Sequence, residues 1–237
     1  MKVVIKGFLQ TSMLDWDGMI VSTLYVPGCN FRCPFCQNSG LVLHPDENEA
    51  IPHEKIIDYL VKKKGWIDGV CISGGEPCMY ENLADFIKTL KSTGMKIKLD
   101  TNGAYPDVLK DLFSQKLLDF TAMDIKAPLE EEPYEKSTGI KNPGLIEKVK
   151  ESIKIIMQSQ VDYEFRTTVV PTLHGREDII KIARFIQGAK KYALQRFQPQ
   201  NTLDPEYMKV KPYHAGELKE ICSLVSGYVI KCVARGI

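Results

Sequence analysis

Short apolar runs alternate with helical patterns along almost the whole chain, and this alternation limits the folds that the chain can adopt. Strands that alternate with helices form βα units around a parallel sheet. Six such units are two short of a closed eightfold barrel, which leaves a partial barrel or an open doubly wound sheet. We predict strands at residues 19–26, 69–73, 95–100, 120–124, 162–170 and 192–198, and helices near residues 53–64, 82–93, 106–116, 143–159, 176–191 and 214–225.

The length of 237 residues fits a single domain, because barrels often run to about 200–250 residues undivided. Within the domain (1–237) we distinguish an N-terminal extension (1–18), a barrel core (19–200) and a C-terminal helix and strand (201–237). Residues 126–144 are rich in charge, Pro and Gly, and we expect them to form a loop.

Charge and hydropathy argue against several classes of protein. The formal net charge of +1 is not that of a nucleic-acid-binding surface. No apolar stretch approaches the roughly 20 residues of a membrane span, and the N-terminus lacks the apolar core and cleavage site of a signal peptide. We therefore expect a cytoplasmic protein with no nucleic-acid and no membrane partner.

Seven cysteines in a reducing compartment do not predict a disulfide framework. Cys71, Cys222 and Cys232 lie in apolar runs or on a predicted helix, and we expect them in the core. Cys78 follows a glycine-rich turn and is expected near the chemistry without taking part in it.

The other three cysteines crowd the segment GCNFRCPFCQN, in which Cys29, Cys33 and Cys36 have the spacing C-x3-C-x2-C. A four-iron cluster needs four ligands, so three thiolates leave one iron free to bind a substrate or cofactor. Phe35 lies where its ring could pack against a bound ring. The alternative is a zinc knuckle completed by a distant cysteine or by His44 or His53.

Polar and glycine-bearing motifs follow the predicted strands. GGEP (74–77), DTNG (100–103), MDIK (123–126), RTTVVP and RFQPQN each stand at a strand end. In parallel α/β folds, ligands bind at the carboxyl ends of the strands. The motifs therefore predict a single site at one end of the sheet.

These motifs resemble those of the radical SAM family, whose C-x3-C-x-aromatic-C loop follows the first strand of a partial, laterally open (β/α)6 barrel. The resemblance implies an α/β fold of that type and one [4Fe–4S] cluster held by the three cysteines. It also implies that S-adenosylmethionine completes the coordination of the fourth iron. Cys71 is the only cysteine between Cys36 and Gly74, so no second cluster is expected.

The resemblance also implies roles for the strand-end motifs. In this family, residues at these positions contact S-adenosylmethionine, and the GGEP region binds its methionine amino group. A monovalent cation, Na+ or K+, is implied at Asp100, Thr101 and Asp124. The implied cofactor contacts are Gly74, Gly75, Glu76, Pro77, Asp100, Asn102, Asp124, Lys126, Arg166 and Gln198.

The segment 11–18 and the cysteine loop resemble the activases of glycyl radical enzymes, in particular those of the anaerobic ribonucleoside-triphosphate reductase, with pyruvate formate-lyase activase as a near relative. Gln37 departs from the histidine that is common there. The resemblance implies a glycyl radical enzyme as protein substrate and a flavodoxin or ferredoxin-type electron donor. A simpler interpretation of the segment is a turn whose Trp16 fills the core.

Other functions stay open at this point. A radical SAM enzyme acting on a small molecule, or an activase of another glycyl radical enzyme, would share every motif. An electron-transfer or redox-sensing iron–sulfur protein would need neither GGEP nor DTNG, and a zinc-stapled binding module would need only the cysteines. A protein substrate is favoured because only about one helix and one strand follow RFQPQN. We expect the partner's chain to enter a lateral gap, with the loop 126–144 and its Glu130, Glu131 and Glu132 as one wall.

Overall fold

A computed structural model of the chain describes residues 2–237, and a single eight-stranded sheet lies at its centre. The strands follow one another in sequence order across the sheet. The first pair is antiparallel and every later pair is parallel. The strands are β1 (Gly7–Ser12), β2 (Val21–Val26), β3 (Gly69–Gly74), β4 (Lys96–Thr101), β5 (Phe120–Asp124), β6 (Asp162–Val169), β7 (Tyr192–Arg196) and β8 (Cys232–Arg235).

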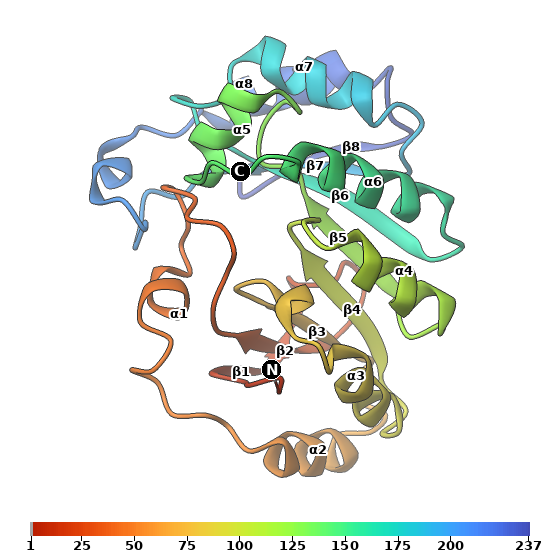
Figure 1. Ribbon diagram of the computed structural model, residues 1–237. Helices are drawn as coiled ribbons and strands as arrows, with labels where there is room; N and C mark the ends of the chain where they lie inside the picture. The colour runs from red at the N-terminus through yellow and green to blue at the C-terminus, as the bar shows by residue number, and fades with distance from the viewer. Residues whose placement is uncertain (1) are drawn as a thin grey trace.

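The sheet is open, because β1 and β8 are its two edges and do not pair with each other. Figure 1 shows most helices in an arc outside the sheet, from α2 through α3, α4 and α6 to α7 and α8. This is the laterally open α/β barrel that the sequence predicts. The helices are α1 (Ser39–Leu43), α2 (His53–Lys62), α3 (Leu83–Lys91), α4 (Pro106–Ser114), α5 (Glu131–Thr138), α6 (Leu145–Gln158), α7 (Arg176–Phe185) and α8 (Ala215–Val225), with the 3-10 turns η1 (Pro77–Met79) and η2 (Pro205–Lys209).

All six predicted strands are present as β2 to β7, and the six predicted helices are present as well. The helix expected at 176–191 ends at Phe185, and Gly188 follows with a φ of +84°. Asn82 stands at the N-cap of α3, but its side chain accepts a hydrogen bond from the Val3 amide at 2.8 Å and does not cap the helix.

The segment 126–144 is not a plain loop, because α5 forms within it. Glu131 and Glu132 lie in the first turn of α5, where acidic side chains complement the helix dipole. Gly139 ends the helix in the left-handed conformation that glycine adopts readily. Glu130 and Glu131 line a surface hollow of about 340 Å³ whose lining contains none of the clustered cysteines. Their role as one wall of the partner's entry gap stays a prediction.

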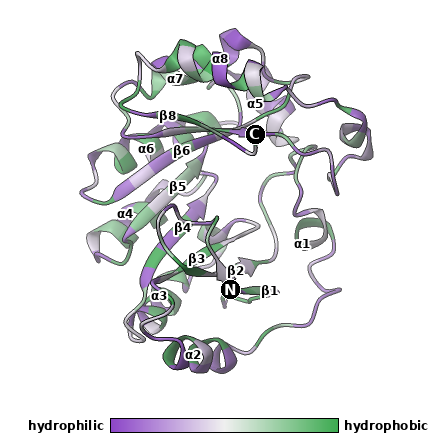
Figure 2. Ribbon diagram, turned by 180° about the vertical axis from the view of Figure 1, so that it is seen from behind, coloured by the Kyte–Doolittle hydropathy of each residue, from purple (hydrophilic) through white to green (hydrophobic). Residues whose placement is uncertain are grey.

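The core lies between the sheet and the covering helices. Each long helix buries one apolar stripe, such as Phe86, Ile87 and Leu90 of α3. Figure 2 shows hydrophobic colour along β2 and β3, and alternation between hydrophobic and hydrophilic residues along α2. The helices cover the outer face of the sheet, and Trp16 of the N-terminal segment packs on Val21, Cys71 and Phe120.

The connection between β1 and β2 lies against the inner face of the sheet. Trp16 is 8% exposed and packs with Val21, Cys71 and Phe120, so it fills the core. Asp17 follows it and forms ion pairs with Lys191 and Arg235. The connection therefore links one edge of the sheet to the other.

We call Asp17, Glu164, Lys191 and Arg235 the edge clasp. Glu164 is 2% exposed, and its two oxygens accept hydrogen bonds from Arg235 at 2.7 and 2.9 Å. Lys191 lies 3.0 Å from the same carboxylate. Burial alone would raise the pKa of Glu164, but Arg235, Arg166 and Lys191 outweigh burial and hold that pKa below its ordinary value.

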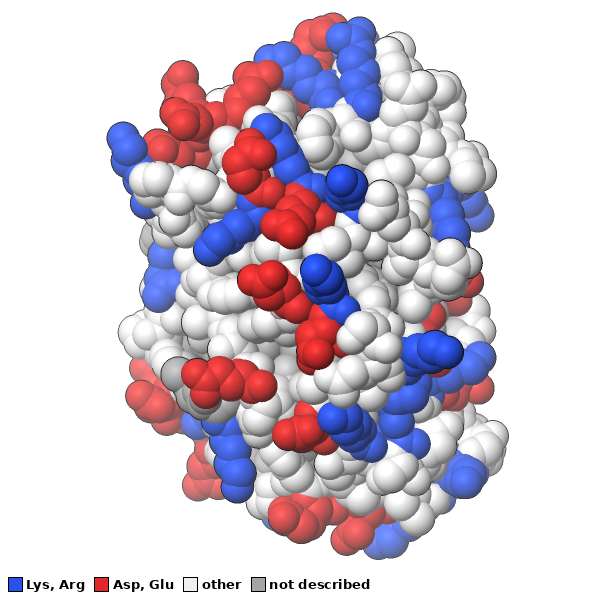
Figure 3. Space-filling model, turned by 45° about the vertical axis from the view of Figure 1, so that its right-hand side comes forward, with Lys and Arg blue, Asp and Glu red and all other residues white. Residues whose placement is uncertain are grey.

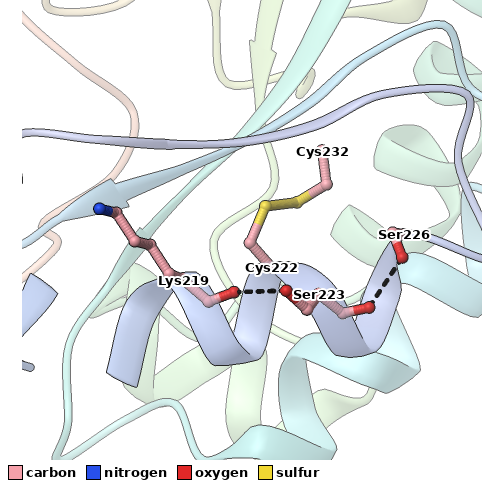
Figure 4. The surroundings of a disulfide bond; sticks show 5 residues. All are labelled: Lys219, Cys222, Ser223, Ser226 and Cys232. Atoms are coloured by element: carbon pink, nitrogen blue, oxygen red, sulfur yellow. Dashed lines mark hydrogen bonds between the residues drawn. A yellow bond between two sulfur atoms is a disulfide. The ribbon is translucent and has the colours of Figure 1, made fainter. Parts of the chain in front are cut away.

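Two of the cysteine predictions are wrong. Cys222 on α8 and Cys232 on β8 are half-buried and form a disulfide, with Cα atoms 5.8 Å apart. Figure 4 shows the bond joining Cys222 on α8 to Cys232, which is the first residue of β8. Periodicity places both residues near the core, but it cannot show that β8 lies directly beside α8. Cys71 is a buried free thiol, as predicted, and Cys78 is a buried free thiol whose amide donates to Glu76.

The surface has no dominant sign of charge on the face shown in Figure 3, where acidic and basic side chains lie interspersed. This agrees with a formal net charge of +1. Among the helices of residues 2–237, none is both long and apolar enough to cross a membrane.

Candidate active site

A cavity of about 370 Å³ lies at the carboxyl ends of the parallel strands. All six of the strands β2 to β7, or the loops that follow them, contribute to its wall. The three clustered cysteines line it together with most of the predicted strand-end residues. The lining includes Asp15, Cys29, Cys33, Phe35, Cys36, Gly74, Gly75, Glu76, Asp100, Thr101, Asn102, Asp124, Lys126, Arg166, Gln195 and Phe197.

Backbone hydrogen bonds from two distant segments hold the cysteine loop. The Arg32 amide donates to the Thr138 carbonyl at the end of α5 at 2.7 Å. The Leu203 amide donates to the Cys36 carbonyl at 3.0 Å. The loop is thus fixed by residues that come more than 100 positions later in the sequence, so its conformation depends on the complete fold.

The two glycines of GGEP allow the loop after β3 to approach the cysteine loop. A Cβ at Gly75 would lie 1.7 Å from the Gly28 carbonyl oxygen. Gly74 has a φ of +105°, which is strained for any other residue, and a Cβ there would meet the Val26 backbone at 2.6 Å. The close approach that the sequence assigns to a ligand is made, in the structure, to the backbone of the cysteine loop.

Glu76 joins the loops after β3 and β4. It is completely buried, and Oε1 accepts hydrogen bonds from the Cys78 amide at 3.0 Å and the Thr101 hydroxyl at 2.8 Å. Oε2 accepts one from the Asn102 amide at 2.7 Å. Burial raises the pKa of Glu76, while these donors oppose that shift. The carboxylate therefore accepts hydrogen bonds from groups of the protein itself, namely two backbone amides and one side-chain hydroxyl.

The sulfur of Cys29 already has donors directed at it. The Phe31 amide lies 3.3 Å from Sγ, and Asn102 Nδ2 lies 3.8 Å from it. Burial raises the pKa of Cys29 to about 11 and that of Cys33 to about 12, and the nearby Lys126 acts in the opposite direction. Three thiols in one cavity, with donors and a cation beside them, fit the thiolate ligands of a metal cluster.

The residues proposed to complete a zinc knuckle lie elsewhere. His44 is exposed and pairs with Glu47 at 3.5 Å, and the ring of His53 packs on Phe86 at 4.6 Å. Neither histidine lines the cavity with the cysteines. The structure therefore gives no support to the zinc alternative.

Phe35 forms part of the cavity wall, and the buried His174 packs against it from behind. Phe35 is 5% exposed and lines the cavity, with its ring 6.4 Å from that of His174. His174 Nδ1 accepts a hydrogen bond from the Val170 amide, so Nε2 donates to the Lys126 carbonyl at 2.7 Å. Burial lowers the pKa of His174 and favours this neutral form.

Five charged side chains alternate in sign along the ends of β4, β5 and β6. Arg166 lies between two carboxylates, with Nη1 3.1 Å from Asp100 Oδ2 and Nε 2.7 Å from Asp124 Oδ1. Lys98 Nζ lies 2.7 Å from Asp100 Oδ1, and Lys126 Nζ lies 2.9 Å from Asp124 Oδ2. Each of the four carboxylate oxygens therefore has a cationic partner within the protein.

This arrangement does not fit a monovalent metal ion between Asp100 and Asp124, because the guanidinium occupies that position. Thr101 is the third expected ligand of the cation, but its hydroxyl donates a hydrogen bond to Glu76. Within residues 2–237, no group of three or more His, Cys, Asp or Glu side chains is placed to hold a single metal ion; the three cysteines face one cavity, and a cluster of several irons does not need them to converge on one ion.

Not every predicted residue reaches the cavity. Pro77 opens the 3-10 turn η1 and is buried outside the lining. The Gln198 carbonyl accepts a hydrogen bond from Gln37 Nε2 at 3.1 Å, and its side chain is not part of the cavity wall. Gln195 and Phe197 line the cavity from the same segment instead, and alternation along the strand could have identified them.

Two further residues escaped prediction. Lys98 is 2% exposed and donates to the Asp15 carbonyl at 2.6 Å. Asp15 itself lines the cavity, with a carboxylate oxygen 2.6 Å from the Thr23 hydroxyl. Both depend on the N-terminal segment folding back into the barrel, for which the local sequence has no signal.

Comparisons with known proteins agree with this site. A family model described as the radical SAM superfamily matches residues 23–186. A Methanocaldococcus jannaschii protein with the provisional name glycyl-radical enzyme activating enzyme is 30% identical over 243 residues, which is 100% of this chain and 98% of its own length. A pyruvate formate-lyase-activating enzyme of Clostridium pasteurianum is 27% identical over 201 residues, 81% of this chain and 79% of its own.

Among solved structures, Streptococcus suis SuiB bound to S-adenosylmethionine superposes with a TM-score of 0.68 at 16% identity. The match covers 88% of this chain and 48% of the SuiB chain, so it reports a shared fold over about half of that protein. The family model covers more than half of the present chain, and the Methanocaldococcus relative matches all of it. The chain therefore belongs to the radical SAM superfamily of enzymes.

Proposed function

We propose that this enzyme is an activase, which uses a [4Fe–4S] cluster and S-adenosylmethionine to generate a glycyl radical on a partner enzyme. The partner that we propose is an anaerobic ribonucleoside-triphosphate reductase, with a flavodoxin or ferredoxin-type protein as electron donor. The observation that carries the proposal is the cysteine loop, whose Cys29, Cys33 and Cys36 face one cavity at the strand ends. Two relatives that match most of the chain carry activase names.

Cys29, Cys33 and Cys36 would hold the cluster, which would supply the one electron needed to cleave S-adenosylmethionine to methionine and a 5′-deoxyadenosyl radical able to remove a hydrogen atom. The chain's own residues bind and orient. The ammonium group of Lys126 has three N–H donors, and one of them makes a hydrogen bond to Asp124. We assign the remaining donors to the methionine carboxylate. The backbone at Gly74 and Gly75 faces the cavity and is assigned to the methionine amino group.

The open sheet supports a macromolecular substrate. β1 and β8 do not pair, and the edge clasp bridges the two edges through the segment after β1. A glycine-bearing segment of the partner would enter beside this segment, whose Asp15 lines the cavity. A hydrogen atom can be transferred only when the reacting atoms approach to about 3–3.5 Å, so the partner's glycine has to enter the cavity itself.

The proposal is tested by anaerobic incubation of the reconstituted enzyme with S-adenosylmethionine, dithionite and the ribonucleotide reductase of the same genome. We expect about four irons per chain, formation of 5′-deoxyadenosine, and a glycyl radical on the reductase in the electron paramagnetic resonance spectrum. The Cys33→Ala variant should give none of the radical.

Three results would point elsewhere. A stable zinc-only protein would support a binding module. An intact cluster that yields no 5′-deoxyadenosine would support an electron-transfer or redox-sensing protein. Stoichiometric modification of a small molecule, with no radical on any glycyl radical enzyme offered, would support the small-molecule alternative.

A further inference from the structure

The ion pairs at the ends of β4, β5 and β6 form a closed set. Asp124 and Arg166 are register partners in the β5–β6 ladder, so their side chains leave the sheet side by side. Asp100 stands at the end of the neighbouring β4. A carboxylate pair on adjacent strands needs a cation between its members, because two like charges at close range repel strongly inside a protein.

Arg166 provides that cation from within the chain. Its side chain is 11% exposed, and the guanidinium binds one oxygen of each carboxylate, at 2.7 and 3.1 Å. Burial alone would lower the pKa of Arg166, but Asp100 and Asp124 outweigh it and keep the guanidinium charged. The planar guanidinium suits this bridging position because its N–H donors point in several fixed directions.

The outer oxygens of the pair also face cations. Lys126 donates a hydrogen bond to the second oxygen of Asp124, at 2.9 Å. Lys98 lies 2.7 Å from the second oxygen of Asp100 and neutralises its charge, although that oxygen accepts no hydrogen bond. Ser73 adds a hydrogen bond to Asp100 Oδ2 at 3.1 Å. A metal ion entering here would have to displace a protein cation and would meet two more within the same cluster.

We propose that Arg166 is a built-in substitute for a monovalent metal ion, and that this enzyme binds its ligand without Na+ or K+ at Asp100 and Asp124. Arg166 is then a positioning residue: it holds Asp124 so that Lys126 is directed toward the cysteines. The inference rests on the proposed function only for the identity of the ligand, S-adenosylmethionine.

The first arm of the test uses the wild-type enzyme and needs no variant. The melting temperature and the affinity for S-adenosylmethionine are measured in KCl, NaCl and tetramethylammonium chloride at equal ionic strength, and thallium-205 resonance probes cation binding directly. We expect the affinity to change by less than about twofold among the three salts, far below the effect of losing a charged hydrogen bond. No specific thallium site is expected.

The second arm of the test removes the guanidinium that lies between the carboxylates of Asp100 and Asp124. In Arg166→Gln the affinity for S-adenosylmethionine should fall by about tenfold in tetramethylammonium, the equivalent of one charge-assisted hydrogen bond. KCl or NaCl should restore most of it, which a merely structural loss would not allow. Arg166→Lys should need less added cation. The double variant Arg166→Gln/Asp124→Asn should lose the cation effect, and Arg176→Gln, which breaks an exposed pair with Glu220, should behave as wild type.

A wild-type enzyme that is stabilised by K+ or Na+ over tetramethylammonium, or that binds thallium at this pair, would overturn the proposal even if every variant failed to fold. An Arg166→Gln variant that folds and binds S-adenosylmethionine equally in all three salts would also overturn it. These measurements need no partner protein and no turnover. A failure here therefore leaves the activase proposal standing, and absence of a glycyl radical leaves this inference standing.

Discussion

The Glu76 carboxylate accepts a hydrogen bond from the Asn102 amide at 2.7 Å and thereby locks the loop after β3 to the loop after β4. Asn102 in turn donates from Nδ2 to Asn30 at 2.8 Å, inside the cysteine loop. A buried carboxylate and one asparagine thus connect three loops around the cavity. The geometry of the site is built on these contacts, and they can be tested one by one.

Replacement of Glu76 by Gln should loosen the site while leaving its volume unchanged. The carboxylate accepts three hydrogen bonds, and an amide nitrogen would face donors where an acceptor is needed. We expect a loss of about 1–3 kcal/mol in the free energy of unfolding, measured by urea denaturation. Glu49→Gln, an exposed loop substitution, is the control. Equal stability of the two variants would show that the lock is unimportant.

A methyl group at Gly75 should push the cysteine loop out of place. The added Cβ would lie 1.7 Å from the Gly28 carbonyl oxygen, so one of the two loops has to move. Gly75→Ala should cost about 1–3 kcal/mol through overpacking and should lower the iron retained per chain after reconstitution. Gly216→Ala on α8 meets nothing within 4 Å and should retain iron as wild type does. Normal iron content in Gly75→Ala would contradict the close packing of the two loops.

Glu164 should make the fold sensitive to acid. Burial raises its pKa, but Arg235, Arg166 and Lys191 together outweigh burial and lower the pKa from 4.5. A lowered native pKa means that the unfolded chain takes up the proton first as pH falls. The ionised Glu164 therefore contributes its full stabilisation when the pH is above its pKa in the unfolded chain. That stabilisation is lost as the pH falls from there through the lower pKa of the folded protein.

We expect the free energy of unfolding to drop as pH falls below the ordinary glutamate pKa and through the lower native pKa of Glu164, and Glu164→Gln to flatten part of that slope. Chemical denaturation at a series of pH values measures it. Glu206→Gln, which breaks an exposed pair with Lys209, should leave the slope as in wild type. An unchanged slope in Glu164→Gln would rule out the edge clasp as an acid-sensitive element.

The disulfide between Cys222 and Cys232 should stabilise the edge strand β8. The two residues are 10 positions apart, and closing a loop of that size is worth about 2–3 kcal/mol in the chain-entropy account. Dithiothreitol should lower the denaturation midpoint of wild type and leave the Cys222→Ser/Cys232→Ser variant unchanged. Two freely titrating thiols in the unreduced, folded protein would show that the bond does not form.

The sequence predicts the strands well because each is a short apolar run bounded by turn residues, and β5 (120–124) is found with the predicted limits. It also predicts which motifs meet, since the ends of parallel strands share one edge. Partners are harder to predict. Lys96 and Lys98 are two residues apart on β4, so their side chains point to the same face of the sheet. Only Lys98 is buried, because Asp15 from the N-terminal segment covers it.

Local signals can also be misread. The start and the end of α5 are present in the sequence as Glu131 and Gly139, but the high content of charge and Pro favours a loop. The bridge from Arg166 to Asp100 and Asp124 depends on three strands in register, which no single segment specifies.

The most direct test of the account follows one hydrogen atom. The partner reductase is produced with glycine deuterated at Cα, and the enzyme is allowed to react with it once under reductant and S-adenosylmethionine. If the enzyme is an activase, the 5′-deoxyadenosine released gains one deuterium, and the glycyl radical signal loses its coupling to the remaining Cα hydrogen. 5′-Deoxyadenosine that forms without deuterium, while no radical appears on the reductase, would contradict the account.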